Sequence, residues 1–218
     1  MKDAPSRLLA EFLGVFFLCL FGIGAIVTQA GTIGVALAHG LAIFVAICAF
    51  AHISGAHFNP AITLAMAATK RISLVDGLAY IVAQLLGGTA AALLAQYAYG
   101  DAWSAGVPTL ASTATLTQGI LVEAIATFAL VIVVMGVAVD QRGTFAAVAG
   151  LPIGLVITAD IFWSGPITGA AMNPARWFGP ALVNGGFGNA LVWIVGPILG
   201  ALVAAYVYDL VMKPAKTA

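Results

Sequence analysis

The chain has 218 residues, of which 62% are hydrophobic and 7% are charged, and its formal net charge is zero. A soluble domain carries roughly 25% charged residues, and residues 12–69 contain no Asp, Glu, Lys or Arg at all. This composition excludes a soluble fold and predicts a protein that crosses a membrane several times. No basic patch is present that would suit a nucleic-acid partner.

Six apolar stretches are long enough to cross a bilayer as helices of about 20 residues. They lie near residues 8–28, 33–52, 77–99, 118–139, 146–163 and 190–211. Two further apolar pieces, near 59–69 and 173–184, have about half that length and are interpreted as re-entrant half-helices. We therefore expect an all-α membrane protein with six transmembrane helices and two re-entrant half-helices.

The lysines and arginines predict the orientation of these helices. With six spans, all but one of the basic residues fall on the same side, and the positive-inside rule places that side, with both termini, in the cytoplasm. The exception is Arg176, which needs a separate explanation. Short connections favour a prokaryotic plasma membrane. The residues on the basic side are Lys2, Arg7, Lys70, Arg71, Arg142, Lys213 and Lys216.

An internal repeat is the strongest pattern in the sequence. Glu11 in the first span corresponds to Glu123 in the fourth. Each repeat consists of three spans plus one half-helix, and the repeats cover about 7–99 and 118–212. Both lie within one domain of residues 1–218. An odd number of crossings per repeat gives the two halves opposite topology. The signature triplet occurs in both halves, as Asn59, Pro60 and Ala61 and again, 114 residues later, as Asn173, Pro174 and Ala175.

The triplet has a physical meaning at the start of a half-helix. Asn is a preferred N-cap and Pro suits the first helical position. If the Asn oxygen accepts from its own helix, the amide NH2 group turns toward the lumen. Each helix N-terminus adds roughly half a positive charge. A single Asn-Pro could merely start a helix, but two in register favour a central site that binds an acceptor oxygen and repels cations.

On these motifs the chain resembles the major intrinsic protein family of aquaporins and aquaglyceroporins, over nearly its whole length. The resemblance implies one pore per subunit in the lipid bilayer, a homotetramer, and water and small neutral solutes as permeants. It implies no cofactor. No metal-ligand spacing and no nucleophile beside a base were found, so neither a metal site nor an enzyme activity is expected.

The resemblance also assigns roles to buried polar residues. Glu11 and Glu123 look like the family's buried glutamates, each expected to accept hydrogen bonds from the backbone of its re-entrant loop. The alternative is a proton-coupling pair in a secondary carrier. His57, just before the first triplet, is expected to line the cytoplasmic mouth of the pore.

The narrow filter is mapped by distance from the two triplets. Arg176 looks like the filter arginine, which binds a solute oxygen and repels cations. The remaining positions fall on His39, Ile161 and Ala170; His39 alone would more often be a core histidine. This set resembles the tonoplast intrinsic and aquaporin-8 groups, some of which pass ammonia or hydrogen peroxide. A glycerol facilitator is the alternative. Trp177 has two open interpretations, packing outward against a neighbouring helix or facing lipid at the interface. Asp160 either holds a loop or pairs with Arg176 through an intermediary.

Overall fold

The computed structural model describes residues 3–212, so Lys2, Lys213 and Lys216 lie outside the described residues. Within this range every regular element is helical, and six helices are long and apolar enough to cross a membrane. The predicted fold class is thereby confirmed. The α-helices are α1 (Ala4–Val27), α2 (Gly31–Ser54), α3 (Pro60–Ala68), α4 (Leu74–Tyr99), α5 (Leu116–Val134), α6 (Gly150–Thr168), α7 (Pro174–Asn184) and α8 (Ala190–Val207).

Short helical pieces extend several of these elements. A 3-10 helix, Gly100–Gly106, follows α4, and another, Ala146–Val148, precedes α6. One turn of π-helix ends each of α5 and α8, at Met135–Val139 and Tyr208–Met212.

Several predicted boundaries differ from the structure: α1 begins at Ala4 rather than near 8, and α6 at Gly150 rather than near 146. Two further differences have local reasons. Helix α4 begins at Leu74 rather than near 77, because the Ser73 side chain accepts a hydrogen bond from Asp76 N at 3.1 Å and caps the helix. Helix α6 continues to Thr168 rather than ending near 163. Pro166 lies inside its last turn. A proline is tolerated in a transmembrane helix because neighbouring helices and side chains satisfy the backbone groups that it leaves without a partner.

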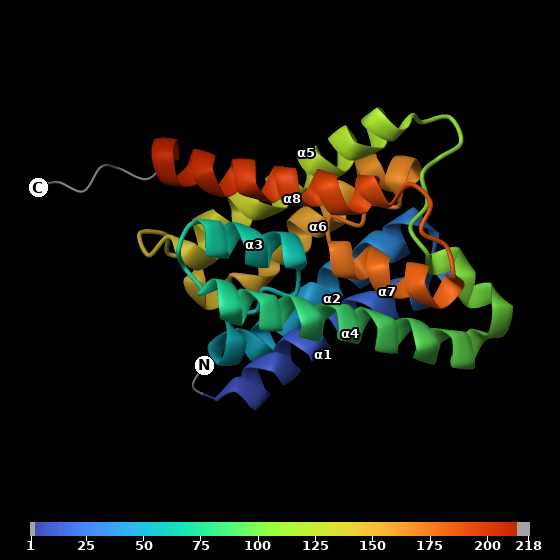
Figure 1. Cartoon of the computed structure of the whole chain (residues 1–218), viewed down its shortest axis with the longest axis horizontal. Helices are drawn as coiled ribbons and strands as arrows, with labels where there is room; N and C mark the ends of the chain where they lie inside the picture. Colours follow the sequence, from blue (N-terminus) through green and yellow to red (C-terminus); the bar gives the residue numbers. More distant parts are fainter. Residues whose placement is uncertain (1–2, 213–218) are drawn as a thin grey trace, which may run out of the picture.

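The arrangement in space follows the predicted inverted repeat. Helix α1 begins and helix α8 ends at the same end of the molecule, the left in Figure 1. The half-helices α3 and α7 lie between α4 and α8, with α3 in the left half and α7 in the right half (Figure 1). With 9 and 11 residues, each rises only about 14–17 Å. Neither can cross the bilayer alone, so the two share its thickness.

Glycines let the long helices approach closely at equivalent places in the two halves. A Cβ at Gly87 of α4 would overlap the carbonyl oxygen of Phe12 in α1, and a Cβ at Gly200 of α8 would overlap that of Ala124 in α5. Between the halves, Gly40 of α2 and Gly154 of α6 each face the other's carbonyl oxygen. Small residues at such crossings are typical of helix packing in membranes.

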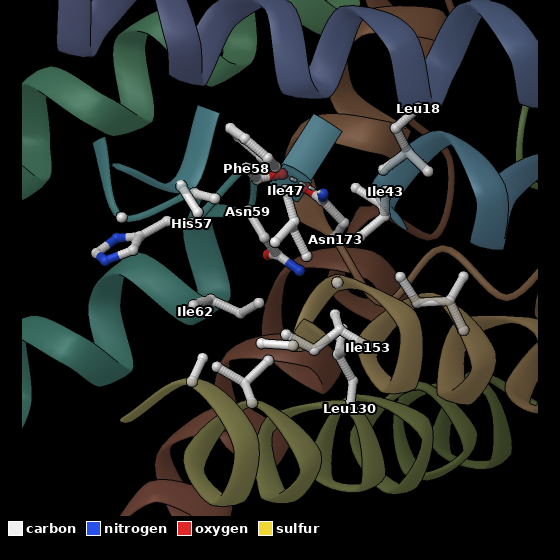
Figure 2. Close-up of a pocket in the computed structure, with 18 of the residues that line it drawn as sticks. Leu18, Ile43, Ile47, His57, Phe58, Asn59, Ile62, Leu130, Ile153 and Asn173 are labelled. Carbon is white, nitrogen blue, oxygen red and sulfur yellow. Dashed lines mark hydrogen bonds between the residues drawn. The ribbon is translucent and has the colours of Figure 1, made fainter. Parts of the chain in front are cut away.

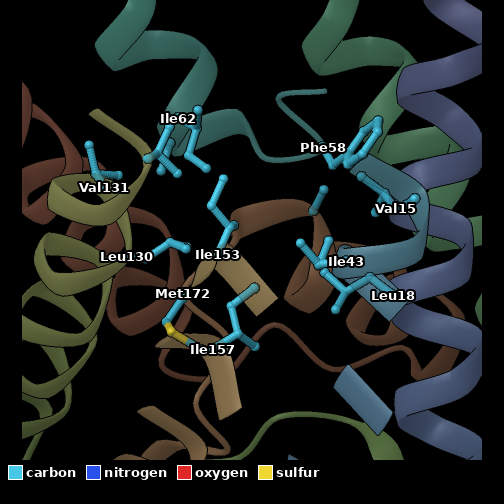
Figure 3. Packing of buried hydrophobic residues seen from close by; sticks show 14 of the residues in the cluster. Val15, Leu18, Ile43, Phe58, Ile62, Leu130, Val131, Ile153, Ile157 and Met172 are labelled. Atoms are coloured by element: carbon cyan, nitrogen blue, oxygen red, sulfur yellow. The ribbon is translucent and has the colours of Figure 1, made fainter. Parts of the chain in front are cut away.

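Apolar side chains fill the middle of the bundle. Figure 3 shows those of α1 and α2 facing those of α3, α5 and α6. The outer faces are apolar as well, with Leu41, Leu86 and Leu155 more than half exposed, which suits lipid contact. Residues drawn in the middle include Leu18, Ile43, Ile62, Leu130, Ile153 and Ile157.

Trp177 is placed by the structure in the interior. It is 2% exposed and stacks on Trp193 of α8, with ring centroids 5.5 Å apart. Phe187 contacts it edge-on at 5.9 Å. The tryptophan anchors the half-helix α7 to α8, and the lipid-facing alternative considered for it is wrong.

Candidate functional site

The two asparagines cap the half-helices as their sequence predicts. Asn59 Oδ1 accepts from Ala61 N at 2.9 Å. Asn173 Oδ1 accepts from Ala175 N at 2.9 Å and from Arg176 N at 3.3 Å. The first free N–H groups of α3 and α7 therefore find acceptors within the triplets.

The amide NH2 groups of these asparagines join the two halves. Asn59 Nδ2 donates to Met172 O, and Asn173 Nδ2 donates to Phe58 O, both at 2.8 Å. The sequence interpretation turned both NH2 groups wholly toward the lumen. Instead, each gives one hydrogen to a carbonyl of the opposite loop, since non-helical backbone at membrane depth must be satisfied. One N–H per asparagine remains for the cavity that both line (Figure 2).

The loops before the half-helices hold an unusual backbone. Ala56 and Phe58 in one loop, and Ala170 and Met172 in the other, have φ between 48° and 53°. This left-handed region is costly for residues with side chains and persists only where surrounding contacts impose it. The same alternation in both loops shows that they share one conformation.

The buried glutamates supply those contacts. Glu11 accepts from His57 N at 2.9 Å and Phe58 N at 2.7 Å. Glu123 accepts from Ala171 N at 2.9 Å and Met172 N at 2.6 Å. Both carboxylates are 0% exposed, and the hydrogen bonds expected from the sequence are present. Further donors are Ser54 and Gln84 for Glu11 and Thr168 for Glu123.

His39 and Arg176 meet on the lumen side of α2 and α7. His39 Nδ1 lies 2.8 Å from Val35 O, and because a carbonyl only accepts, Nδ1 carries the hydrogen. His39 Nε2 is then a bare acceptor, and Arg176 approaches it with Nε at 3.4 Å and Nη2 at 3.3 Å. Histidine thus fixes the guanidinium at the wall of the lumen.

One nitrogen of the arginine is an unsatisfied buried donor. Arg176 is 2% exposed, and its Nη1 is buried without a hydrogen-bond partner among residues 3–212. A buried donor without a partner is costly unless water or a ligand satisfies it. Arg176 Nη1 therefore carries N–H groups that no acceptor within residues 3–212 satisfies, and the atom itself is closed to solvent.

A cavity of about 400 Å³ connects this place to the end of the molecule where α1 begins and α8 ends. It runs from His39 and Arg176 past both asparagines to His57 and Ala146. Its walls are mostly apolar, as Figure 2 shows. Arg176 also lines a second, outer cavity of about 250 Å³, so the two cavities meet at the arginine.

The two remaining predicted filter positions differ in their relation to this path. Ala170 lines the inner cavity. Ile161 is 5% exposed and is packed in the core, while on the same face of α6 Ile157 lines the inner cavity and Gly165 the outer one. Ile161 is four residues from each of them and so lies between them on this face of α6. It is therefore beside the junction of the two cavities but lines neither.

Asp160 lies outside this constellation. Its Oδ1 accepts from Trp163 Nε1 at 3.0 Å, and its Oδ2 is buried without a partner among residues 3–212. No hydrogen bond within the described residues connects it to Arg176.

Sequence reasoning missed several polar partners of the loops. Ser54 and Thr168 donate to the two glutamates from equivalent positions, 114 residues apart like the triplets. Tyr80 OH donates to Ser54 O at 2.7 Å, and Trp193 Nε1 donates to Thr168 O at 3.0 Å. The repeat offset, applied to every polar residue, was the signal that could have found the first pair.

The comparisons with known proteins agree with this geometry. The family model of the major intrinsic proteins matches residues 2–208. Aquaporin NIP1-1 of Zea mays is 41% identical over 94% of this chain and 74% of its own length. Probable aquaporin TIP3-2 of Arabidopsis thaliana is 40% identical over 97% of this chain and 85% of its own.

A solved structure shares the fold. The X-ray structure of the aquaglyceroporin from Plasmodium falciparum superposes with a TM-score of 0.86 at 27% identity, covering 97% of this chain and 98% of that one. The TIP-type relatives agree with the branch that the filter residues resemble. This chain therefore belongs to the major intrinsic protein family, whose aquaporin members are membrane channels and not enzymes.

Proposed function

We propose that this channel passes water together with small neutral solutes such as ammonia or hydrogen peroxide, and excludes protons and ions. The observation that carries the proposal is the apolar cavity of about 400 Å³ that ends at the buried guanidinium of Arg176. A neutral solute is favoured where one fixed donor meets it, and a cation is repelled by the same charge.

The chemistry of the constriction favours a broader solute range than water alone. The one bare nitrogen of His39 is occupied by Arg176, and Ile161 and Ala170 add no polar atom. Such a constriction imposes few hydrogen-bond requirements, so a small solute with one acceptor lone pair, where water has two, loses little there. This supports ammonia as a second permeant.

Glycerol is the second candidate, because a structural neighbour is an aquaglyceroporin. Against it, the filter positions lack the aromatic pair expected of glycerol facilitators. Trp177, next to Arg176, cannot supply an aromatic face because it is buried against Trp193.

The roles of the loop residues follow the same proposal. Asn59 and Asn173 offer one N–H each at the centre of the path, and His57 lines the cytoplasmic mouth. Glu11 and Glu123 act as scaffolds, because both oxygens of each carboxylate already accept loop N–H groups. A proton-coupling acid would have to release these contacts on each cycle.

Topology and assembly are part of the proposal. The described basic residues Arg7 and Arg71 follow the start of α1 and the end of α3, which supports cytoplasmic termini. We also propose a homotetramer of single channel domains, with repeats near 7–99 and 118–212. The two sequence relatives named above are plant proteins and give no support to a prokaryotic membrane, so that expectation is not carried further.

Substitution of Ile161 by histidine tests the solute range. The added polar ring should narrow the junction and introduce a hydrogen-bonding requirement, so ammonia flux into proteoliposomes should fall severalfold while water flux is largely kept. Ile161→Val is the matched control, since it keeps an apolar side chain. Stopped-flow recordings of water-driven shrinkage and of ammonia-driven alkalinisation of the same vesicles provide both rates. Unchanged ammonia flux in Ile161→His would remove the basis for a filter role of this residue.

A further inference from the structure

The hydroxyl of Thr63, in the second turn of α3, has three short polar contacts. It lies 3.0 Å from Asn59 O, 3.0 Å from Gln84 Nε2 and 3.2 Å from His57 Nδ1. Thr63 is 0% exposed, so protein groups alone satisfy this hydroxyl. The second-half position at the same offset is occupied by Trp177, and only the cytoplasmic half has this arrangement.

The orientation of Gln84 is fixed by its neighbours. Its Nε2 also lies 2.7 Å from Glu11 Oε2, and that carboxylate is surrounded by donors. Because the carboxylate needs a donor here, the NH2 end of Gln84 faces both Glu11 and Thr63. Gln84 therefore donates to the Thr63 hydroxyl.

The hydroxyl has only one hydrogen to give. Asn59 O is an acceptor, so the hydrogen must lie between it and Thr63 Oγ1; otherwise two oxygens would face each other at 3.0 Å with nothing between them. With that hydrogen used, the contact with His57 is a hydrogen bond only if His57 Nδ1 carries the proton and donates. One donated and two accepted bonds then satisfy Thr63 completely.

The other ring nitrogen of His57 belongs to the cavity. His57 lines the cavity at its cytoplasmic end, and Figure 2 draws its ring turned away from the two asparagines. Nε2 has no hydrogen-bond partner among residues 3–212, and it is not among the fully buried polar atoms that lack one. Tyr80 packs edge-on against the ring at 5.3 Å and limits its movement.

We infer that Thr63 is a positioning residue that holds His57 as the Nδ1–H tautomer, so that His57 Nε2 is a hydrogen-bond acceptor at the cytoplasmic mouth. Its ligand is the donor hydrogen of a neutral permeant such as water or ammonia. The inference rests on the proposed channel function and adds to it one specific binding atom.

This acceptor complements the polarity of the rest of the path. Arg176 and the two asparagines offer donors, so water oxygens point toward the centre and water hydrogens point outward. At the cytoplasmic end an outward hydrogen needs an acceptor. In the opposite tautomer, His57 Nε2 would carry the hydrogen. This N–H would then face a hydrogen of the last water molecule in the file, and no hydrogen bond could form between them.

Solid-state NMR on ¹⁵N-histidine-labelled protein in bilayers tests the tautomer directly. The chain has three histidines, and spectra at about pH 8, where imidazoles are neutral, distinguish Nδ1–H from Nε2–H rings. His57→Gln serves only to assign the His57 signals. We expect His57 as the Nδ1–H form in the wild type and in Thr63→Ser, which keeps the hydroxyl. In Thr63→Val, His57 should shift toward the Nε2–H form.

Water flux in the same variants gives the functional readout. Loss of one neutral hydrogen bond in the file should lower the permeability of Thr63→Val about two- to tenfold, with recovery in Thr63→Ser. Thr69→Val is the matched control: it removes a hydroxyl that bonds Ala65 O at the end of the same helix, so tautomer and flux should both stay unchanged.

Two results would overturn the inference. One is an Nε2–H ring at His57 in the wild type, which needs no variant to fold. The other is a Thr63→Val channel with an unchanged tautomer and unchanged flux. If wild-type vesicles show the Nδ1–H ring but no water flux above the lipid control, the proposed channel function fails while the positioning of His57 by Thr63 stands.

Discussion

Replacing Arg176 by valine should open the path to small cations. The substitution removes a unit charge that is buried at the junction of the two cavities, where a low dielectric makes it far more effective than a surface charge. It also frees His39 Nε2, which turns the constriction from a donor site into an acceptor site. We expect cation conductance to rise at least about tenfold, which corresponds to only about 1.4 kcal/mol of barrier.

Conductance of planar bilayers that contain the purified protein measures this effect. Lys70→Gln is the control, since it removes a positive charge from an exposed position at the end of α3. The control should remain non-conducting. An Arg176→Val channel that conducts no better than the control would show that the arginine does not provide the cation barrier.

Replacing Glu123 by alanine should have the largest effect on stability. Three donors lose their acceptor: Thr168 Oγ1, Ala171 N and Met172 N. Each buried donor without a partner costs about 1–3 kcal/mol, so the sum approaches the whole stability of a typical domain, about 5–15 kcal/mol. The left-handed backbone at Ala170 and Met172 would also lose the contacts that impose it.

The fraction of protein that remains folded in detergent after heating measures this loss. Glu123→Ala should aggregate at a markedly lower temperature than the wild type and show no water flux. Asp101→Asn, an exposed acid in the 3-10 helix after α4, should behave as wild type. Equal heat resistance of Glu123→Ala and Asp101→Asn would contradict a scaffold role for the glutamate.

The sequence predicted the helices and the ends of the half-helices because these depend on local properties. Apolar runs of about 20 residues specify the spans, and the Asn-Pro pairs specify the starts of α3 and α7. The offset of the repeat correctly predicted that Glu11 and Glu123 contact the two re-entrant loops, because equivalent residues of an inverted repeat have equivalent contacts.

What the sequence could not predict depends on contacts between segments. The bonds from Asn59 to Met172 and from Asn173 to Phe58 join loops more than 110 residues apart, and no local pattern signals them. Trp177 is read as an interfacial residue from its type alone, but the partner that buries it, Trp193, is 16 residues further along the chain.

Departures from the repeat were the least predictable part of the site. Gln84 and Pro197 occupy equivalent positions, yet only Gln84 can donate to a glutamate and to Thr63. Thr63 and Trp177 also occupy equivalent positions, but Thr63 accepts a hydrogen bond from Gln84 whereas Trp177 stacks on Trp193. The first repeat thus carries a polar network where the second repeat carries stacked indole rings, and the difference becomes visible only when both sets of contacts are known.

The measurement that tests the channel assignment most directly is the temperature and gradient dependence of water flux through purified protein in proteoliposomes. A passive channel predicts shrinkage far faster than in empty vesicles, a low activation energy close to that of free water diffusion, no saturation, and no response to a proton gradient. Flux that saturates or follows the proton gradient would contradict the account and favour a carrier coupled through Glu11 and Glu123.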